Sequence, residues 1–268
     1  MENTNIEKLT KRAEQGDVAA IRELADYYYD EIVDSEDADV IYNLGYLYEN
    51  LKDNPEKAIE CYTKAAELGN PQAQYSLAIS YENGEGVEQD QKKAVEWYTK
   101  AAEQGDADAQ FNLGNCYYNG EGVEQDYKKA VEWYTKAAEQ GDADAQFNLG
   151  DCYYNGEGVE QDYKKAVEWY TKAAEQGDAC AQNNLAISYQ NGEGVEQDQK
   201  KAVEWYTKAA EQGNKEALNN LGECYRDGAG VERDCKKAVE LFSKSAELGC
   251  ADAQFNLGNC YKNGTGVE

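Results

Sequence analysis

The sequence contains no histidine among its 268 residues and only two prolines. Without an imidazole, Ser-His-Asp and Cys-His nucleophilic centres are excluded, as are metal sites that depend on histidine ligands. No apolar run approaches the roughly 18 residues that a membrane-spanning helix requires, and residues 1–17 lack the apolar core of a secretory leader. We therefore expect a cytoplasmic protein without a membrane span that is not an enzyme.

Positive charge is also scarce. The chain has 26 lysines and arginines against 53 aspartates and glutamates, which gives a formal net charge of -27. A surplus of negative charge opposes binding to nucleic acid or to an anionic membrane, because both carry the same sign. The composition favours a protein or extended-peptide partner that is neutral to basic.

The chain is internally repetitive. Residues 92–127 are followed by thirty-six residues that repeat them with one change, Asn115 becoming Asp151. Weaker copies cover residues 56–91 and 164–235, and a broken copy covers residues 236–268. A period of this length is typical of solenoid proteins, in which one unit cannot bury its apolar face alone and stacked neighbours share a continuous core.

Within one repeat, the apolar residues follow the spacing of two helices. Ala109, Leu113 and Tyr117 recur at i, i+4 and i+8, and a second periodic segment follows a turn that contains two glycines. Asp106 and Asp126 are suited to cap the two helices. We predict helix A over residues 107–119 and helix B over residues 126–140, with Val123 packing the turn between them onto the core.

The motif A-x3-LG-x2-Y-x2-G-x-GV-x2-D-x3-A-x3-Y-x2-A-A recurs from about Asp37 to Glu268. It resembles the Sel-one-like repeat, a relative of the tetratricopeptide repeat. The resemblance implies an all-α, right-handed superhelical solenoid of antiparallel helix pairs, with A helices lining a concave side. It also implies an adaptor that assembles other proteins. Residues 1–36 are interpreted as an irregular N-terminal helical cap and residues 37–268 as the solenoid, whose last repeat is incomplete.

The two ends depart from the motif. Residues 6–15 resemble the end of a helix B and residues 18–30 resemble a helix A, with no helix B between residue 30 and the next helix A. The final helix A lacks a partner, which leaves Leu257 and Tyr261 partly exposed. Either the natural chain continues, or the B-like segment of another molecule docks there in head-to-tail self-association.

Several recurrent residues have structural explanations. Cys116, Cys152, Cys224 and Cys260 share a position that serine takes in other repeats, which indicates a small buried side chain, and no Cys-x-x-Cys pair is present for zinc. The four tryptophans share a helix B position with Cys61 and Leu241, which favours packing between repeats. The GEGVEQD turns lack the ligand pattern of a calcium loop. We expect reduced thiols, no metal and no cofactor.

Helix A varies between repeats at three positions, those of Phe111, Asn115 and Tyr118. Their i, i+4, i+7 spacing places them on one stripe, apart from the stripe of Leu113 and Tyr117. In the tetratricopeptide family the corresponding positions contact peptides. The predicted partner-binding residues, which include a recurrent asparagine beside this stripe, are Tyr42, Asn43, Tyr46, Tyr75, Phe111, Asn112, Asn115, Tyr118, Phe147, Asn148, Asp151, Tyr154, Asn184 and Asn220.

Two interpretations of these side chains stay open. The asparagines could pair with the backbone of an extended peptide, or each could bond a neighbouring helix. The aromatic rings could form apolar contacts with a partner, or they could pack within the array.

Three functional classes are compatible with this sequence. The first is an interaction scaffold that holds a peptide or partner surface in its concave groove. The second is a purely structural repeat array. The third is a β-lactam-binding enzyme like secreted cysteine-rich relatives, whose cysteines pair within each hairpin, whereas residues 102–108 contain none here.

Overall fold

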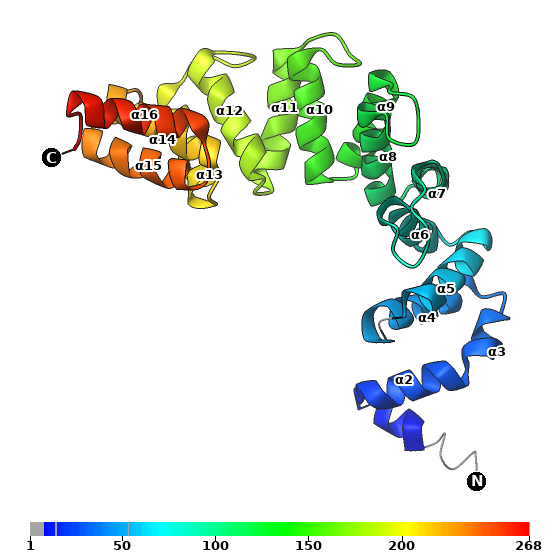
Figure 1. Cartoon of the computed structure of the whole chain (residues 1–268). Coiled ribbons are helices and arrows are strands. Elements are labelled where there is room, and N and C mark those ends of the chain that lie inside the picture. Colours follow the sequence, from blue (N-terminus) through cyan, green and yellow to red (C-terminus); the bar gives the residue numbers. More distant parts are fainter. Residues whose placement is uncertain (1–7, 14, 53, 268) are drawn as a thin grey trace. The chain divides into compact units, whose positions relative to one another are not determined.

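The computed structural model describes residues 8–13, 15–52 and 54–267, and the regular elements of this part are helices (Figure 1). The chain divides into two compact units, Met1–Trp133 and Tyr134–Glu268. Each unit is built from successive helical hairpins, and each is described by itself below. Within the described residues, no helix combines the length and the apolar character needed to cross a lipid bilayer.

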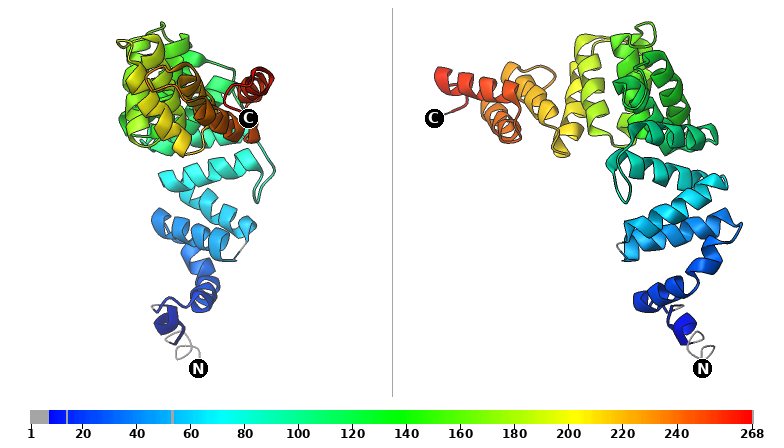
Figure 2. Two further views of the ribbon diagram at one scale, coloured as in Figure 1. Left: turned by 90° about the vertical axis from the view of Figure 1, so that its left-hand side faces the viewer. Right: turned by 45° about the vertical axis from the view of Figure 1, so that its right-hand side comes forward.

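Helices A and B alternate along each unit (Figure 2). The A helices are α4 (Ala38–Lys52), α6 (Pro71–Asn83), α8 (Ala107–Asn119), α10 (Ala143–Asn155), α12 (Ala179–Asn191), α14 (Lys215–Asp227) and α16 (Ala251–Asn263). The B helices are α5 (Pro55–Glu67), α7 (Gln91–Glu103), α9 (Tyr127–Glu139), α11 (Tyr163–Glu175), α13 (Gln199–Glu211) and α15 (Cys235–Glu247).

Each helix A packs on the helix B that follows it, and each of these B helices packs on the next helix A. In the first unit this holds for α4 to α8, and in the second for α10 to α16. The expected all-α array of antiparallel helix pairs is confirmed within each unit.

The predicted boundaries of helix A are confirmed to the residue in α8. The carboxylate of Asp106 accepts a hydrogen bond from the amide of Ala109, and Asp126 accepts from the amides of Lys128 and Lys129. Each aspartate satisfies amides that have no partner inside the helix. Helix B spans Tyr127–Glu139, one residue shorter at each end than predicted, and Asp126 takes the capping role that was expected of it.

The expected helix over residues 18–30 is shorter than predicted. α2 (Val18–Tyr27) ends with Tyr28 as its C-cap, and a five-residue helix, α3 (Tyr29–Val33), follows. The chain turns at this point because Tyr29 enters the core, where its ring meets Tyr48 edge-on at 5.3 Å and its hydroxyl donates to Glu60 at 2.6 Å. Of the expected helix over residues 6–15, residues 8–13 are helical, and part of it lies outside the described residues.

The core of each hairpin is organised around one large side chain of helix B. It is a tyrosine in five hairpins and Phe242 in the last, and all are almost completely buried. The ring lies so close to helix A that a Cβ on Gly150 would come within 2.6 Å of Tyr170. Gly45 stands in the same relation to Tyr62 at 2.7 Å. Full burial of such a ring contributes about 1.5–3 kcal/mol, and the glycine permits it by removing a side chain from the contact.

The tryptophans and cysteines take the structural roles expected of them. Trp97 packs against two successive core clusters of the first unit, and Trp205 does the same in the second. The eight cysteines are free thiols. Burial raises the pKa of Cys116 and of Cys152 to about 12, so these thiols stay protonated and unreactive at neutral pH.

The last helix A exposes apolar side chains. Phe255 is 71% exposed and Tyr261 is 64% exposed on α16, while Leu257 is partly buried. The expected exposure at this helix is therefore seen, and it includes Phe255, whose exposure was not predicted.

The loop inside each hairpin also joins successive repeats. Gly194, in the loop after α12, has φ +73°, and a Cβ added to it would overlap the backbone carbonyl of Tyr163 at the start of α11. The loop of one repeat thus lies directly on the first turn of helix B in the preceding repeat. Only glycine permits both the left-handed backbone and this close approach.

We predict that Gly194→Ala lowers the free energy of unfolding by about 2–4 kcal/mol, because left-handed strain and overlap with backbone add together. Gly177→Ala is the matched control, since Gly177 has φ +103° and open space around its Cβ position. The control should cost about 1–2 kcal/mol from strain alone. Urea denaturation followed by circular dichroism measures both, and equal losses would contradict the loop contact.

Candidate interaction site on the A helices

We call the positions equivalent to Phe111, Asn115 and Tyr118 the A stripe. In α8 and α10 the stripe residues are half-buried, neither sealed in the core nor fully in solvent. In α4, Tyr46 is 53% exposed. In α12 and α14 the first stripe position holds Asn183 and Asn219, which are buried.

The aromatic side chains of the A stripe pack against aromatic side chains of helix B. The ring centroids of Tyr42 and Tyr62 are 5.7 Å apart, and those of Phe147 and Tyr170 are 6.2 Å apart. Tyr75 packs on the equivalent tyrosine of α7, and Tyr118 and Tyr154 pack edge-on against tyrosines at the start of helix B. One side of each ring is therefore held by packing, which fixes its orientation before any partner arrives.

The buried tyrosine of helix B also reaches the stripe with its hydroxyl. This group donates to a stripe acceptor in four hairpins: Tyr62 to Glu49 at 2.8 Å, Tyr98 to Glu82 at 2.6 Å, Tyr170 to Asp151 at 2.6 Å and Tyr206 to Gln190 at 2.6 Å. These hydrogen bonds were not predicted from the sequence. The available signal was a constant tyrosine on helix B combined with a carboxylate or amide at a variable position on helix A.

The asparagines beside the stripe bond neighbouring A helices. Asn184 donates to Asp151 at 3.1 Å, and Asn220 donates to Asn183 at 3.1 Å. In the first unit, Asn112 donates to the Tyr75 hydroxyl at 3.3 Å. These bonds join α8 to α6, α12 to α10 and α14 to α12. Four other predicted residues also take part in a hydrogen bond, ring contact or electrostatic interaction: Phe111, Asn115 and Tyr118 on α8, and Asn148 on α10.

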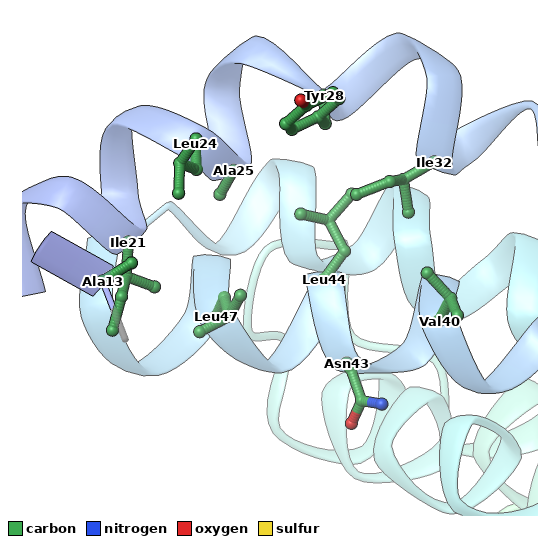
Figure 3. A pocket seen from close by; sticks show the side chains of 10 residues that line it. All are labelled: Ala13, Ile21, Leu24, Ala25, Tyr28, Ile32, Val40, Asn43, Leu44 and Leu47. Carbon is green, nitrogen blue, oxygen red and sulfur yellow. The ribbon is translucent and has the colours of Figure 1, made fainter. Parts of the chain in front are cut away.

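Asn43 lies apart from the other predicted residues. It lines a cavity of about 310 Å³ between α2, α3 and α4, whose other walls are formed mostly by aliphatic side chains such as Leu24, Ile32 and Leu44. In Figure 3 the amide of Asn43 points away from those side chains. This cavity is apolar and does not continue the chemistry of the A stripe.

Three of the predicted residues converge in the second unit. Asp151 and Tyr154 of α10 and Asn184 of α12 line a hollow of about 220 Å³, together with Asn155, Tyr170 and Ile187. The hydroxyl of Tyr154 donates across to Glu193, in the loop after α12, at 2.8 Å. The hollow is thus bounded by two successive repeats and depends on their stacking.

The hollow is acidic. Burial raises the pKa of Asp151, and the charges of Glu157 and Asp178 act in the same direction. The hydrogen bonds from Tyr170 and Asn184 lower the pKa of Asp151 but do not outweigh burial. The sequences of α10 and α12 contain no lysine or arginine, so neither helix supplies a counter-ion.

A second acidic hollow lies in the first unit. It has a volume of about 260 Å³, and Glu49, Glu85 and Tyr62 line it together with apolar and small residues of α5 and α6. Both hollows contain a carboxylate of the A stripe that accepts a hydrogen bond from the buried tyrosine of helix B.

The side chains that line these hollows are suited to binding a ligand. Oxygen acceptors and half-buried aromatic rings are suited to N–H donors and to apolar side chains. Within the described residues, no group of three or more histidine, cysteine, aspartate or glutamate side chains is arranged to hold a metal ion.

An array of antiparallel helix pairs with a variable stripe on its A helices defines a helical-repeat protein. The Sel1 repeat family model matches residues 38–70, 71–106, 107–142, 143–178, 181–214, 215–250 and 251–268, and the chain belongs to this family. Proteins built from Sel1 repeats generally serve as protein-interaction scaffolds, and the repeat is typically non-catalytic. No curated protein matches the sequence significantly.

Solved structures give the same assignment. A protective antigen of uropathogenic Escherichia coli with an SLR fold is 39% identical with a TM-score of 0.80, and the match covers 97% of this chain and 52% of the antigen. The chain thus spans about half the length of that relative. A Sel1 repeat protein from Oxalobacter formigenes is 37% identical with a TM-score of 0.78, covering 85% of this chain and 91% of that one.

The relation to tetratricopeptide repeats holds at the level of fold. The C-terminal part of a TPR repeat-containing protein from Cytophaga hutchinsonii is 16% identical with a TM-score of 0.55, and the match covers 94% of this chain and 99% of that one.

We predict that Asp151→Asn stabilises the protein at pH 7. The pKa of Asp151 is raised in the folded chain, so ionising this carboxyl opposes folding above the folded pKa, and the cost disappears as pH falls below the unfolded value. Both hydrogen bonds use Oδ1, which an asparagine retains. The difference in unfolding free energy between variant and parent should shrink from pH 7 towards about pH 3.5.

The control for this pH series is Asp144→Asn, an exposed carboxylate in the first turn of the same helix. This substitution also removes one negative charge, but from an exposed carboxylate whose ionisation carries no desolvation cost. It should be neutral or slightly destabilising at pH 7, because a negative charge near a helix N-terminus is favourable. Thermal unfolding at several pH values measures both variants. A destabilised Asp151→Asn variant at pH 7 would contradict the assignment.

Proposed function

We propose that this chain is a non-enzymatic scaffold that binds an extended, neutral to basic segment of a partner protein along its A stripe. The observation that carries the proposal is the convergence of Asp151, Tyr154 and Asn184 on one hollow between successive repeats. Asp151 and Tyr154 belong to a stripe that varies, whereas Asn184 is the recurrent asparagine beside it and the packing residues around it stay nearly constant. Variation confined to one accessible stripe is the pattern of a recognition surface on a repeated framework.

The A stripe offers two kinds of contact to such a segment. Phe147 and Tyr154 present aromatic surface held on one side by helix B, and rigid aromatics contribute strongly to interaction hot spots. Asp151, Glu49 and Glu82 present carboxylates positioned by tyrosine hydroxyls. Acidic groups on a chain with net charge -27 accelerate the association of basic segments and disfavour acidic ones.

A purely structural array is the main alternative, and the asparagine bonds between A helices support it in part. Those bonds account for the asparagines, yet they do not account for the half-buried aromatics and the acidic hollow. An enzymatic role finds little support, since the chain has no histidine and burial raises the pKa of its core thiols. The cysteine-rich alternative requires paired cysteines, whereas the eight here are free.

A selection experiment tests the proposal. Random peptides of about twelve residues, displayed on phage, are selected on the immobilised chain, and synthetic versions of the enriched peptides are measured by fluorescence anisotropy. The double variant Phe147→Ala, Tyr154→Ala should weaken binding at least about tenfold, because truncating a hot-spot aromatic typically costs more than about 1.4 kcal/mol.

The matched control is the double variant Glu168→Ala, Glu204→Ala, which changes exposed positions on helices α11 and α13. Its affinity should stay within about twofold of the parent, since exposed single charges contribute little. Circular dichroism verifies that all variants are folded. A selection without enriched peptides, or equal binding by the aromatic double variant, would reject the A stripe as the binding surface.

A further inference from the structure

We infer that the hollow at Asp151 is a guanidinium subsite, which takes an arginine side chain of the segment that the scaffold binds. The inference deepens the proposed function and rests on it. It is carried by a comparison between two repeats of the same unit, one of which already contains an arginine at this position.

Each wall of the hollow has a counterpart two repeats later. Asp151 corresponds to Glu223, Tyr154 to Arg226, Tyr170 to Phe242 and Asn184 to Asn256. Both places contain a hydrogen bond from the asparagine to the carboxylate, although Phe242 lacks the hydroxyl that Tyr170 donates to Asp151. Asn184 donates to Asp151 at 3.1 Å, and Asn256 donates to Glu223 at 2.9 Å.

In the later repeat, the chain's own arginine occupies this environment. Nη1 of Arg226 donates to Asn256 at 3.1 Å, and Nε and Nη2 each donate to the carboxylate of Asp227 at 2.8 Å. The guanidinium carbon lies 5.9 Å from the centroid of the Phe242 ring. The hydrogen bond to Asp227 and the charge of Glu223 both raise the pKa of Arg226. The framework therefore holds a guanidinium between an amide oxygen, carboxylates and an aromatic ring.

The earlier repeat keeps the asparagine, the carboxylate and the aromatic ring, but it has Asn155 in place of Asp227 and no arginine of its own. Tyr154 stands in place of Arg226, and its hydroxyl is directed to Glu193 at 2.8 Å. The hydrogen bonds that Asp151 accepts from Tyr170 and Asn184 both end on Oδ1. Asp151 lines the hollow together with Asn155, which stands in place of Asp227.

Charge supports the same occupant. Burial raises the pKa of Asp151, so the hydrogen bonds from Tyr170 and Asn184 offset only part of the cost of ionising it in the folded chain. A cation brought by a partner would offset the rest of that cost, because a partly buried carboxylate is stabilised by a hydrogen-bonded opposite charge. α10 and α12 contain no lysine or arginine. On α11, which contributes Tyr170, Lys165 and Lys172 lie over the rings of Tyr153 and Trp169.

Arginine fits this hollow better than lysine does. The planar guanidinium presents several N–H donors in a fixed fork and stacks on aromatic faces, whereas an ammonium is a compact, strongly hydrated charge. The residues here that carry acceptors are Asp151, Asn155 and Asn184, with Tyr170 beside them. The Oδ1 of Asn184 accepts from Asn183 at 3.3 Å, and a carbonyl oxygen has a second lone pair for another donor. One flat, multidentate donor can reach several of them at once.

The test uses three capped amino acids as probes of the intact chain: N-acetyl-arginine methylamide and its lysine and citrulline counterparts. Citrulline keeps the shape of arginine and removes its charge. NMR shifts of the Asn184 side-chain amide and the Ile187 methyl groups report binding at the hollow. We expect millimolar binding of the arginine probe, at least about fivefold weaker binding of the lysine probe, and no shifts with citrulline.

Two substitutions make the test specific. Asp151→Asn keeps the hydrogen bonds on Oδ1 and removes the charge, and it should weaken binding of the arginine probe at least about fivefold. Tyr154→Arg reproduces the later repeat, and it should fill the hollow, abolish probe binding and lower the NMR-measured pKa of Asp151. The control Asp144→Asn should leave probe binding unchanged.

The outcomes separate this inference from the proposed function. Equal shifts with the arginine and lysine probes, or unchanged binding in Asp151→Asn, would overturn the guanidinium assignment. If displayed peptides bind the A stripe but no probe shifts Asn184 or Ile187, the subsite is rejected and the scaffold function stands. If no peptide is selected while the arginine probe binds, the subsite stands as a binding site and the proposed scaffold function fails.

Discussion

The contact on which each hairpin depends is the one between the buried aromatic ring of helix B, a tyrosine in all but the last hairpin, and the backbone of helix A. The ring needs a glycine or alanine opposite it, as Gly150 shows for Tyr170, and the tyrosine hydroxyl emerges on the A stripe to bond an acceptor. One side chain therefore joins the apolar core to the variable surface. A tyrosine suits this position because it combines a large apolar ring with a polar tip that needs a partner when buried.

This arrangement explains why the repeats vary where they do. Close packing restricts three positions: the ring, the glycine or alanine opposite it, and the loop glycine. At each of them a single added carbon would disturb the packing. The stripe positions meet only part of that constraint, so Asp151, Ile187 and Glu223 can occupy equivalent places on similar hairpins. The polar character of each hollow is thus decided locally, by a few residues, while the framework around it stays the same.

Much of the fold could be predicted from the sequence because its determinants are local. The bounds of α8 and the capping roles of Asp106 and Asp126 follow from short-range spacing and turn chemistry. The break at Tyr28 could not be predicted, because it depends on Tyr29 finding Tyr48 and Glu60 in later helices. Local pattern carries no information about such distant partners.

The candidate site was predictable only as a set of positions. The spacing of helix A placed Asp151 and Tyr154 on one stripe, but the hollow needs Asn184 from the next repeat and the hydroxyl of Tyr170 from below. The asparagine bonds between A helices were one of two open interpretations, since spacing alone does not give the distance between stacked helices. Contacts between repeats, rather than those within a repeat, are what the structure adds.

The two nearly identical repeats have an evolutionary consequence. Residues 92–127 and 128–163 differ only in Asn115 and Asp151, a stripe position. Because each repeat brings its own ring, glycines and caps, a tandem gene duplication adds a complete hairpin whose stability is already secured, and one nucleotide substitution then gives the copy a different electrostatic character. An array of this kind can diversify its ligand preference one hairpin at a time, by unequal crossing-over followed by point mutation.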